Sequence, residues 1–367
     1  MIRKTAINSN LKNKVKRLLK KGGIMKRKVA QLIAPKQFEV IEEEIQPIKS
    51  NELLVKMVSI GLCHSEIPTY LGKSTIAVND KGEFIKDEDM CYPIQLGHEP
   101  IGIVEEVGKD LKGGEFKERD YISGLIIASF ASFAVVKPAV NQVIKVSKDV
   151  RKIEYCLGEP LMCISNIVRA AAPVFGDYVA VIGCGMMGLT TLSGLAKSAA
   201  FELIGIDLVP SRLELAKKYG ATKTVNPKEV DAVSTIKEIT SGKGVDIAVE
   251  ISGSMAGFSL ACKIVKGGTV SSLGARAKIL IPSLYGIPQM MDAGYDLMYK
   301  SPIIHSTHPF YSQDYIDDLR KGIEGYKRGI FPLDSMITHE FKLEEIGKAF
   351  EMLEHPTSDY LKGVIKP

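Results

Sequence analysis

The chain has 367 residues, of which 45% are hydrophobic and 25% charged, a globular composition in a chain long enough for two domains. Its formal net charge of +5 is concentrated in residues 1–24, which carry eight basic residues and no acidic one, so residues 25–367 carry 40 basic against 43 acidic residues. This balance excludes a body that binds nucleic acid by charge. The longest apolar run, residues 124–136, is too short to span a membrane, and we expect it to form buried strands instead.

The basic segment 1–24 has apolar residues at helical spacing from Leu11 to Leu19. It could be an amphipathic helix at a membrane surface, a basic arm for nucleic acid, or a segment without function. We favour the third interpretation, because residues 20–23 read Lys-Lys-Gly-Gly, which is what a purine-rich ribosome-binding site encodes when translated in frame. Met25 begins a natural first strand, and we expect the working protein to start there.

The cysteines are scattered through the chain without short paired spacings: Cys63, Cys91, Cys156, Cys163, Cys184 and Cys262. In a chain of this length that scatter indicates a reduced, cytoplasmic protein with one cysteine engaged in chemistry.

Short strand-like runs cover residues 28–33 and 38–42, and a stronger one covers 52–58. The third run leads into Cys63, which His64 and Ser65 follow. A cysteine at the end of a strand offers a thiolate ligand with a hydroxyl beside it. The ordinary alternative is a buried structural cysteine.

Residues 73–92 read as a charged loop that is a candidate rim for a substrate pocket. Next come His98 and Glu99, which stand between glycines at the start of an alternating apolar run, residues 101–107, that predicts a strand. An imidazole and a carboxylate at the mouth of a strand can both reach a zinc ion. A simple hydrogen-bonded pair would give the same pattern.

Glu159 begins an apolar, helix-like run that continues through Val168. An acid at the start of a helix is common for capping alone. Cys163 lies one turn further along the same helix face. The residues therefore leave Glu159 and Cys163 as alternatives for a third metal ligand.

A dinucleotide-binding fingerprint follows a buried-strand run at 178–182. Its glycines allow a tight turn and a close approach of the backbone to a pyrophosphate at the start of the next helix, and they are Gly183, Gly185 and Gly188. The following strand, residues 202–206, ends in Asp207, at the spacing that the fingerprint requires. Asp207 would bind the ribose hydroxyls and repel a 2′-phosphate, which favours NAD over NADP.

The alternation of strands and helices continues and indicates a doubly wound sheet. The predicted strands cover 245–250 and 268–273, the predicted helices cover 258–264, 315–327 and 343–353, and a last strand lies near Val364.

Together, Cys63-His64-Ser65, Gly97-His98-Glu99, Glu159 and the turn at 183–188 resemble the zinc-containing medium-chain alcohol dehydrogenases, nearest the sorbitol (polyol), threonine and secondary-alcohol branch. The resemblance runs from about Met25 to Pro367. It implies an α/β fold in which a Rossmann doubly wound parallel sheet joins a discontinuous, mostly β, GroES-like catalytic domain. The implied division is an extension at 1–24, the catalytic domain at 25–168, the NAD-binding domain at 169–304 and a return to the catalytic domain at 305–367.

The same resemblance assigns roles to individual residues. Cys63 and His98 match the first two zinc ligands, Glu159 falls where the third lies, and Cys163 is a possible substitute. Glu99 is expected to bind zinc directly or through water. Ser65 matches the hydroxyl that starts a proton relay, and His64 a position near the cofactor phosphates or at the outer end of the relay. The predicted cofactor-binding residues are Gly183, Gly185, Met186, Met187, Gly188, Asp207 and Arg212.

Two departures from the family pattern matter. No cysteine stands between Gly108 and Ala134, where the family often has four, so we expect one catalytic zinc and no structural zinc. The stretch between Cys63 and His98 is longer than is typical, so the identity of the substrate does not carry over.

The predicted function is zinc-dependent hydride transfer between NAD and a secondary alcohol or polyol and its ketone. One alternative is a zinc- and NAD-dependent epimerase or lyase without net redox. Another is a cofactor-binding protein without catalysis. The expected partners are a small alcohol or ketone and further copies of the chain, as a dimer or tetramer, with no nucleic acid and no membrane.

Overall fold

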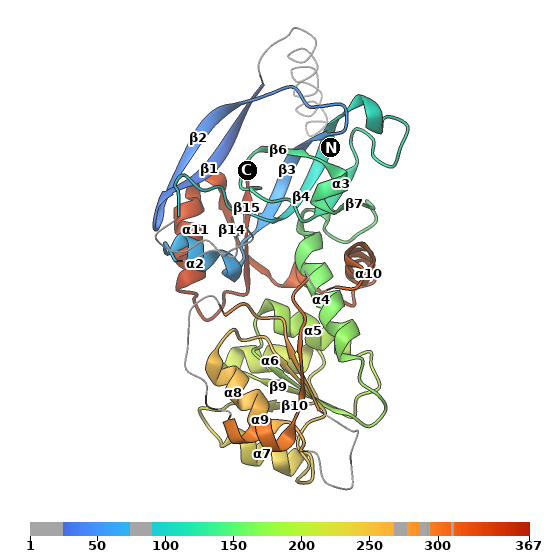
Figure 1. The fold of residues 1–367 in the computed structure, drawn as a ribbon, viewed down its shortest axis with the longest axis vertical. Helices are drawn as coiled ribbons and strands as arrows, with labels where there is room; N and C mark the ends of the chain where they lie inside the picture. Colours follow the sequence, from blue (N-terminus) through green and yellow to red (C-terminus); the bar gives the residue numbers. More distant parts are fainter. Residues whose placement is uncertain (1–24, 74–89, 268–276, 286–291, 293, 310–311) are drawn as a thin grey trace, which may run out of the picture.

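The computed structural model describes residues 25–73, 90–267, 277–285, 292, 294–309 and 312–367. Two sheet-centred halves lie one above the other in Figure 1, and the upper half contains both the first and the last strands. The segment 1–24, most of the charged loop 73–92 and the expected strand 268–273 lie outside the described residues. None of the helices in the described part of the chain combines the length and the apolar character needed to span a bilayer.

The upper half contains an antiparallel pair, β1 and β2, and a seven-stranded sheet in the order β14-β15-β3-β4-β5-β7, with β6 paired to β3. Its strands are β1 (Met25–Ala34), β2 (Gln37–Ile45), β3 (Leu53–Gly61), β4 (Glu99–Val107), β5 (Tyr121–Gly124), β6 (Phe133–Val136), β7 (Val143–Val146), β14 (Ile337–Lys342) and β15 (Lys362–Lys366). The last strands of the chain therefore return to the sheet that the first ones began.

The lower half is a parallel sheet in the order β10-β9-β8-β11-β12-β13. Its strands are β8 (Tyr178–Ile182), β9 (Glu202–Ile206), β10 (Lys223–Val225), β11 (Ile247–Glu250), β12 (Lys278–Ile281) and β13 (Ile303–Ser306). The central strands are apolar throughout because both faces of a parallel sheet are covered by helices. The order reverses at β8, which is the doubly wound topology that places a ligand beyond the carboxyl ends of these strands.

The α-helices of the described residues are α2 (Ile67–Tyr70), α3 (Pro138–Asn141), α4 (Gly158–Ala171), α5 (Met186–Leu195), α6 (Pro210–Lys218), α7 (Ala232–Ile239), α8 (Met255–Ile264), α9 (Gly294–Lys300), α10 (Tyr315–Lys327) and α11 (Ile346–Glu354). Short 3₁₀ turns are η1 (His64–Glu66), η3 (Lys109–Leu111), η4 (Ile153–Tyr155), η6 (Leu333–Ser335) and η7 (Leu343–Glu345).

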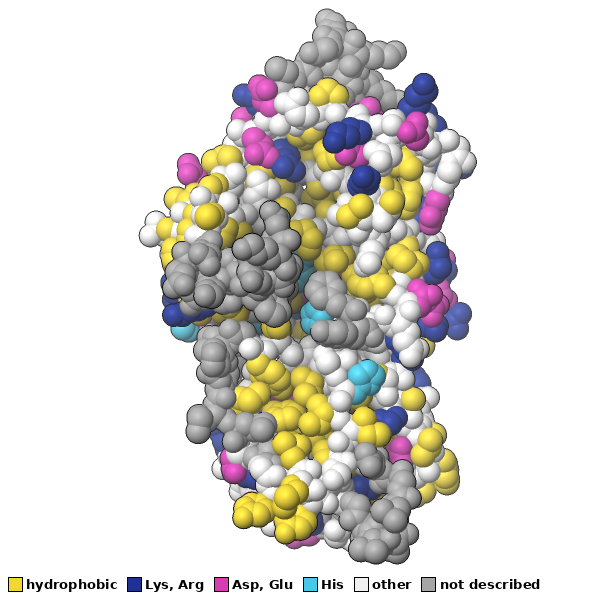
Figure 2. All heavy atoms as spheres, viewed as in Figure 1, with side chains coloured by type: hydrophobic (Ala, Val, Ile, Leu, Met, Phe, Trp, Pro, Cys, Tyr) yellow, Lys and Arg dark blue, Asp and Glu magenta, His cyan; other side chains and the backbone are white. Residues whose placement is uncertain are grey.

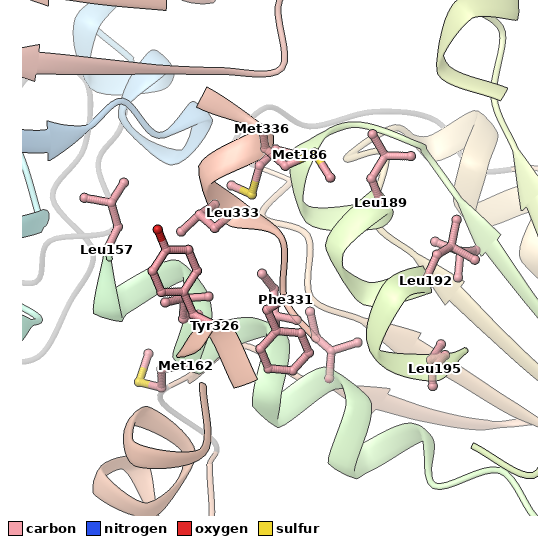
Figure 3. Close-up of a cluster of buried hydrophobic side chains, with 14 of the residues drawn as sticks. Leu157, Met162, Met186, Leu189, Leu192, Leu195, Tyr326, Phe331, Leu333 and Met336 are labelled. Atoms are coloured by element: carbon pink, nitrogen blue, oxygen red, sulfur yellow. The ribbon is translucent and has the colours of Figure 1, made fainter. Parts of the chain in front are cut away.

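One buried cluster joins the two halves around α4. Figure 3 shows Leu157 and Met162 facing Tyr326, Leu333 and other side chains, while α5 supplies Met186, Leu189, Leu192 and Leu195. Ile101 of the upper sheet and Val249 of the lower sheet belong to the same cluster. The helices α4, α5 and α10 therefore fix one half against the other.

The expected fold class is confirmed: a doubly wound parallel sheet accompanies a mostly β, discontinuous second unit. The expected division at 168/169 and 304/305 stays a prediction; α4 continues to Ala171 and β13 to Ser306.

The apolar run 124–136, which we expected to form buried strands, does so only in part. β5 ends at Gly124 and β6 begins only at Phe133, and between them Ala128 has a left-handed φ of 58° that breaks an extended chain. The apolar run is buried for another reason: it lies against β1, where the Ala30 amide donates to the Phe130 carbonyl at 2.9 Å.

Candidate metal centre and cofactor site

Three predicted metal ligands meet at the ends of paired strands. Cys63 lies two residues beyond the end of β3, and Glu99 begins β4, where it stands directly opposite Gly61 in the antiparallel register. Ligand atoms of Cys63, His98 and Glu99 all lie within 4.8 Å of one another. Zinc binds sulfur, nitrogen and oxygen ligands at about 2.0–2.3 Å, so one ion placed among these atoms can reach all three. The donor set and its spacing therefore fit zinc.

The carboxylate of Glu66 fixes the His98 ring. Glu66 Oε1 accepts a hydrogen bond from the Gly97 amide at 2.6 Å and lies 3.1 Å from His98 Nδ1. Burial lowers the pKa of His98, but the nearby Glu66 carboxylate and Cys63 thiol outweigh it, so the pKa lies well above its usual value. With Nδ1 facing Glu66, Nε2 remains for a metal. Glu66 is not among the residues predicted from the sequence; its only local signal is an acid three residues after a ligand cysteine.

Glu159 lies in the first turn of α4, 8% exposed, beside Cys163. The Cys163 thiol donates to Glu159 Oε1 at 3.3 Å, so the two alternatives for a third ligand contact each other. Burial raises the pKa of Glu159, while the charge of nearby His98 lowers it. Glu159 is not among the three residues within 4.8 Å of one another, and its role as a ligand stays a prediction.

Ser65 and His64 lie in η1, directly after Cys63. The Ser65 hydroxyl donates to Cys63 Sγ at 3.2 Å, so it is next to the metal ligands, as a relay requires. Burial lowers the pKa of His64, and the positive charges of Lys362 and Arg212 lower it further, to about 4. His64 is therefore neutral at neutral pH. Figure 2 shows histidine side chains along the waist between the two halves.

Two residues that sequence reasoning missed approach the same centre from the segment after β13. Burial and the charge of His98 lower the pKa of His308. Burial, followed by the charges of Glu159 and Cys163, raises the pKa of Tyr315. No local sequence pattern marks either residue, because long-range contacts with α4 bring this segment to the metal ligands. Asn166 of α4 donates to the Thr307 carbonyl beside His308, and α10, which begins at Tyr315, packs on α4.

The predicted dinucleotide turn lies between β8 and α5. Gly183 has a φ of 100°, and a Cβ there would lie 2.8 Å from the Ser252 backbone. Gly185 caps α5, and a Cβ on it would meet nothing within 4 Å, so the space beside the helix N-terminus is open. This geometry fits a pyrophosphate. The Met186 side chain is buried in the core, so only its backbone is placed to contact a cofactor.

Asp207 follows β9 and lies beside this turn. Its Oδ2 accepts a hydrogen bond from the Cys184 amide at 2.7 Å and its Oδ1 from the Val209 amide at 2.9 Å. Arg212 of α6 extends toward the upper half, where Nη2 donates to the Tyr360 carbonyl at 3.4 Å. The two amides therefore fix the carboxylate beside the glycine turn, and the guanidinium bridges the halves.

Comparisons with known proteins agree with this arrangement. Residues 49–148 match the family model of the alcohol dehydrogenase GroES-like domain, and residues 187–300 match that of the zinc-binding dehydrogenases. An alcohol dehydrogenase of Cupriavidus necator is 25% identical over 93% of this chain and 98% of its own. A sorbitol dehydrogenase of Bacillus subtilis is 26% identical over 93% and 97%. The crystal structure of 2R,3R-butanediol dehydrogenase from Bacillus subtilis has a TM-score of 0.75 at 22% identity, covering 93% of this chain and 99% of its own.

The donor set at the ends of β3 and β4, the glycine turn before α5 and these matches lead to one conclusion. The chain belongs to the family of zinc-containing medium-chain alcohol dehydrogenases.

Proposed function

We propose that the protein is a zinc-dependent oxidoreductase that transfers a hydride between NAD and a secondary alcohol or polyol and its ketone. The observation that carries the proposal is the convergence of Cys63, His98 and Glu99 within 4.8 Å, in a chain that also has the glycine turn of a dinucleotide site. When bound, zinc supplies Lewis acidity and NAD accepts the hydride.

The chain's own residues hold and move the other components. Cys63 and His98 hold the metal, with Glu159 as the proposed third ligand, and Glu66 keeps the His98 ring in one orientation. Ser65 takes the proton from the alcohol hydroxyl and passes it outward, toward His64 or solvent. The turn at Gly183–Gly188 holds the pyrophosphate.

The preference for NAD over NADP is part of the proposal. Asp207 places a carboxylate, fixed by two backbone amides, at the ribose position, and a 2′-phosphate there would meet a like charge. We also propose one zinc per chain. We further propose a cytoplasmic location, which the scattered spacing of the cysteines favours.

We further propose that the protein is a homo-oligomer, a dimer or tetramer. β13 is an edge strand with Ile303 and Ile304 about half exposed, and neighbouring α9 exposes Tyr295, Met298 and Tyr299. Figure 2 shows hydrophobic side chains over the lower part of the molecule, where Figure 1 draws α9. An uncharged edge strand beside exposed apolar side chains suits pairing with a second copy.

The test of the activity uses Cys63→Ser, with Cys91→Ser, at an exposed thiol outside the cluster, as the matched control. We expect the first variant to lose zinc and NADH formation with diols and secondary alcohols, while the control keeps both. Full zinc content with full activity in Cys63→Ser would overturn the proposal. Turnover of the substrate without net NADH would favour the epimerase or lyase alternative.

A further inference from the structure

Glu99 takes part in two arrangements at once. It belongs to the cluster of potential ligands with Cys63 and His98, and its Oε2 also lies 2.5 Å from Nζ of Lys362. Both side chains of this ion pair are almost fully buried, with 5% of the lysine and 2% of the glutamate exposed. A buried ion pair beside a metal site puts an ammonium group and a metal ion in competition for one carboxylate.

The register of the strands creates this pair. β3 lies between β4 and β15, and Gly61 stands opposite Glu99 on one side and opposite Val364 on the other. A Cβ on Gly61 would collide with the Glu99 carboxylate, so the glycine leaves the space through which that carboxylate approaches Lys362 at the start of β15.

The charges around the centre show what the lysine does there. Nζ of Lys362 lies 2.5 Å from the Glu99 carboxylate, so its ammonium group forms a buried ion pair beside the metal ligands. The Cys63 thiolate and the carboxylates of Glu99 and Glu159 would place three anionic groups around one divalent ion. The positive charge of Lys362 offsets one of these negative charges. A catalytic zinc site keeps one coordination position open for water or substrate.

We propose that Lys362 holds Glu99 as a reserve ligand outside the inner coordination sphere and so keeps one metal position open for the alcohol. Without the ammonium group, the buried Glu99 carboxylate loses this ion pair and binds the metal, filling that position. Lys362 is in this sense a positioning residue that acts through Glu99. The inference rests on the proposed metal site at Cys63 and His98.

The experiment loads the full-length protein with Co²⁺, whose visible absorption reports coordination number, and measures zinc affinity by competition with a chelator. The variants are Lys362→Met, Glu99→Gln and their combination. Lys366→Met, also on β15 but in a more exposed ion pair with Glu340, is the matched control. If the Lys362→Met protein does not fold without metal, Lys362→Gln takes its place.

We expect Lys362→Met to bind zinc about tenfold more tightly, the order of change typical of residues next to a ligand, and to give a weaker Co²⁺ absorption band of higher coordination. Glu99→Gln, the double variant and the control should keep the Co²⁺ spectrum of the unaltered protein. Removing a positive charge could by itself favour a cation, but that effect would persist in the double variant, whereas the expected effect disappears with Glu99.

An unchanged Co²⁺ spectrum in Lys362→Met, or the same gain in affinity with and without Glu99, overturns the inference and leaves the metal site intact. Failure of the unaltered protein to bind Co²⁺ or Zn²⁺ would overturn the proposed function itself. The two failures are therefore distinguishable.

Discussion

Glu66 offers the sharpest test of how the metal centre is built. Its buried carboxylate accepts from the Gly97 amide at 2.6 Å and faces His98 Nδ1 at 3.1 Å. Hydrogen bonds to a charged group are worth roughly 1.5–3 kcal/mol each. The loss of partners that orient a ligand histidine costs about 10–100-fold in metal affinity. We therefore expect Glu66→Gln to bind zinc about tenfold more weakly and Glu66→Ala about 100-fold more weakly.

The assay is competition between the protein and a chelator for zinc, with the melting temperature of the metal-free protein measured in parallel to separate folding from binding. Glu52→Gln is the control, because it alters a carboxylate that also accepts from a backbone amide, that of Lys49, but at an exposed position. Zinc affinity within twofold of the unaltered protein in a folded Glu66→Ala variant would refute the idea that Glu66 orients His98.

Three further predictions concern the cofactor site and the pH dependence of stability. Gly185→Ala should weaken NADH binding, measured by fluorescence, without lowering the melting temperature, because a Cβ there would meet nothing within 4 Å; unchanged binding would argue against a pyrophosphate at this turn. Asp207→Ser should raise the KM for NAD and reduce the preference for NAD over NADP; an unchanged preference would exclude Asp207 as the discriminating group. The Tyr155 hydroxyl donates to Glu340 and thereby lowers the pKa of that carboxyl. The bond therefore stabilises the fold at a pH above the usual glutamate pKa of about 4.3. This contribution is lost as the pH falls below that value and the carboxyl takes up a proton. Tyr155→Phe should therefore lower the melting temperature at pH 7 more than at pH 3, and an equal loss at both would contradict this assignment.

The predictions from sequence succeeded where a pattern is local. The helix expected at 315–327 is α10, with the same limits, because its apolar residues repeat at helical spacing and Asp314 caps it. The expectation that Cys63, His98 and Glu99 approach one another agrees with their spacing in the structure, because each stands at the end of a recognisable strand.

The contacts that the sequence did not reveal depend on register and on long-range packing. Lys362 and Glu99 come from opposite ends of the chain and meet only because β15 and β4 flank β3. Tyr315 approaches Glu159 only because α10 packs on α4. The interruption of the strands within 124–136 has a different origin. Apolar composition indicates that a segment is buried but does not reveal a left-handed residue such as Ala128.

The apolar cluster around α4 has a consequence for how the molecule melts. Because Gly194 of α5 lies against Val168 of α4 and Phe331, and Ser193 donates to the Ile330 carbonyl at 2.8 Å, a fragment limited to the parallel sheet and its helices would leave this face of α5 in contact with water. We therefore expect the two halves to unfold together on heating, and a fragment limited to the nucleotide-binding half to melt at a lower temperature than the whole protein.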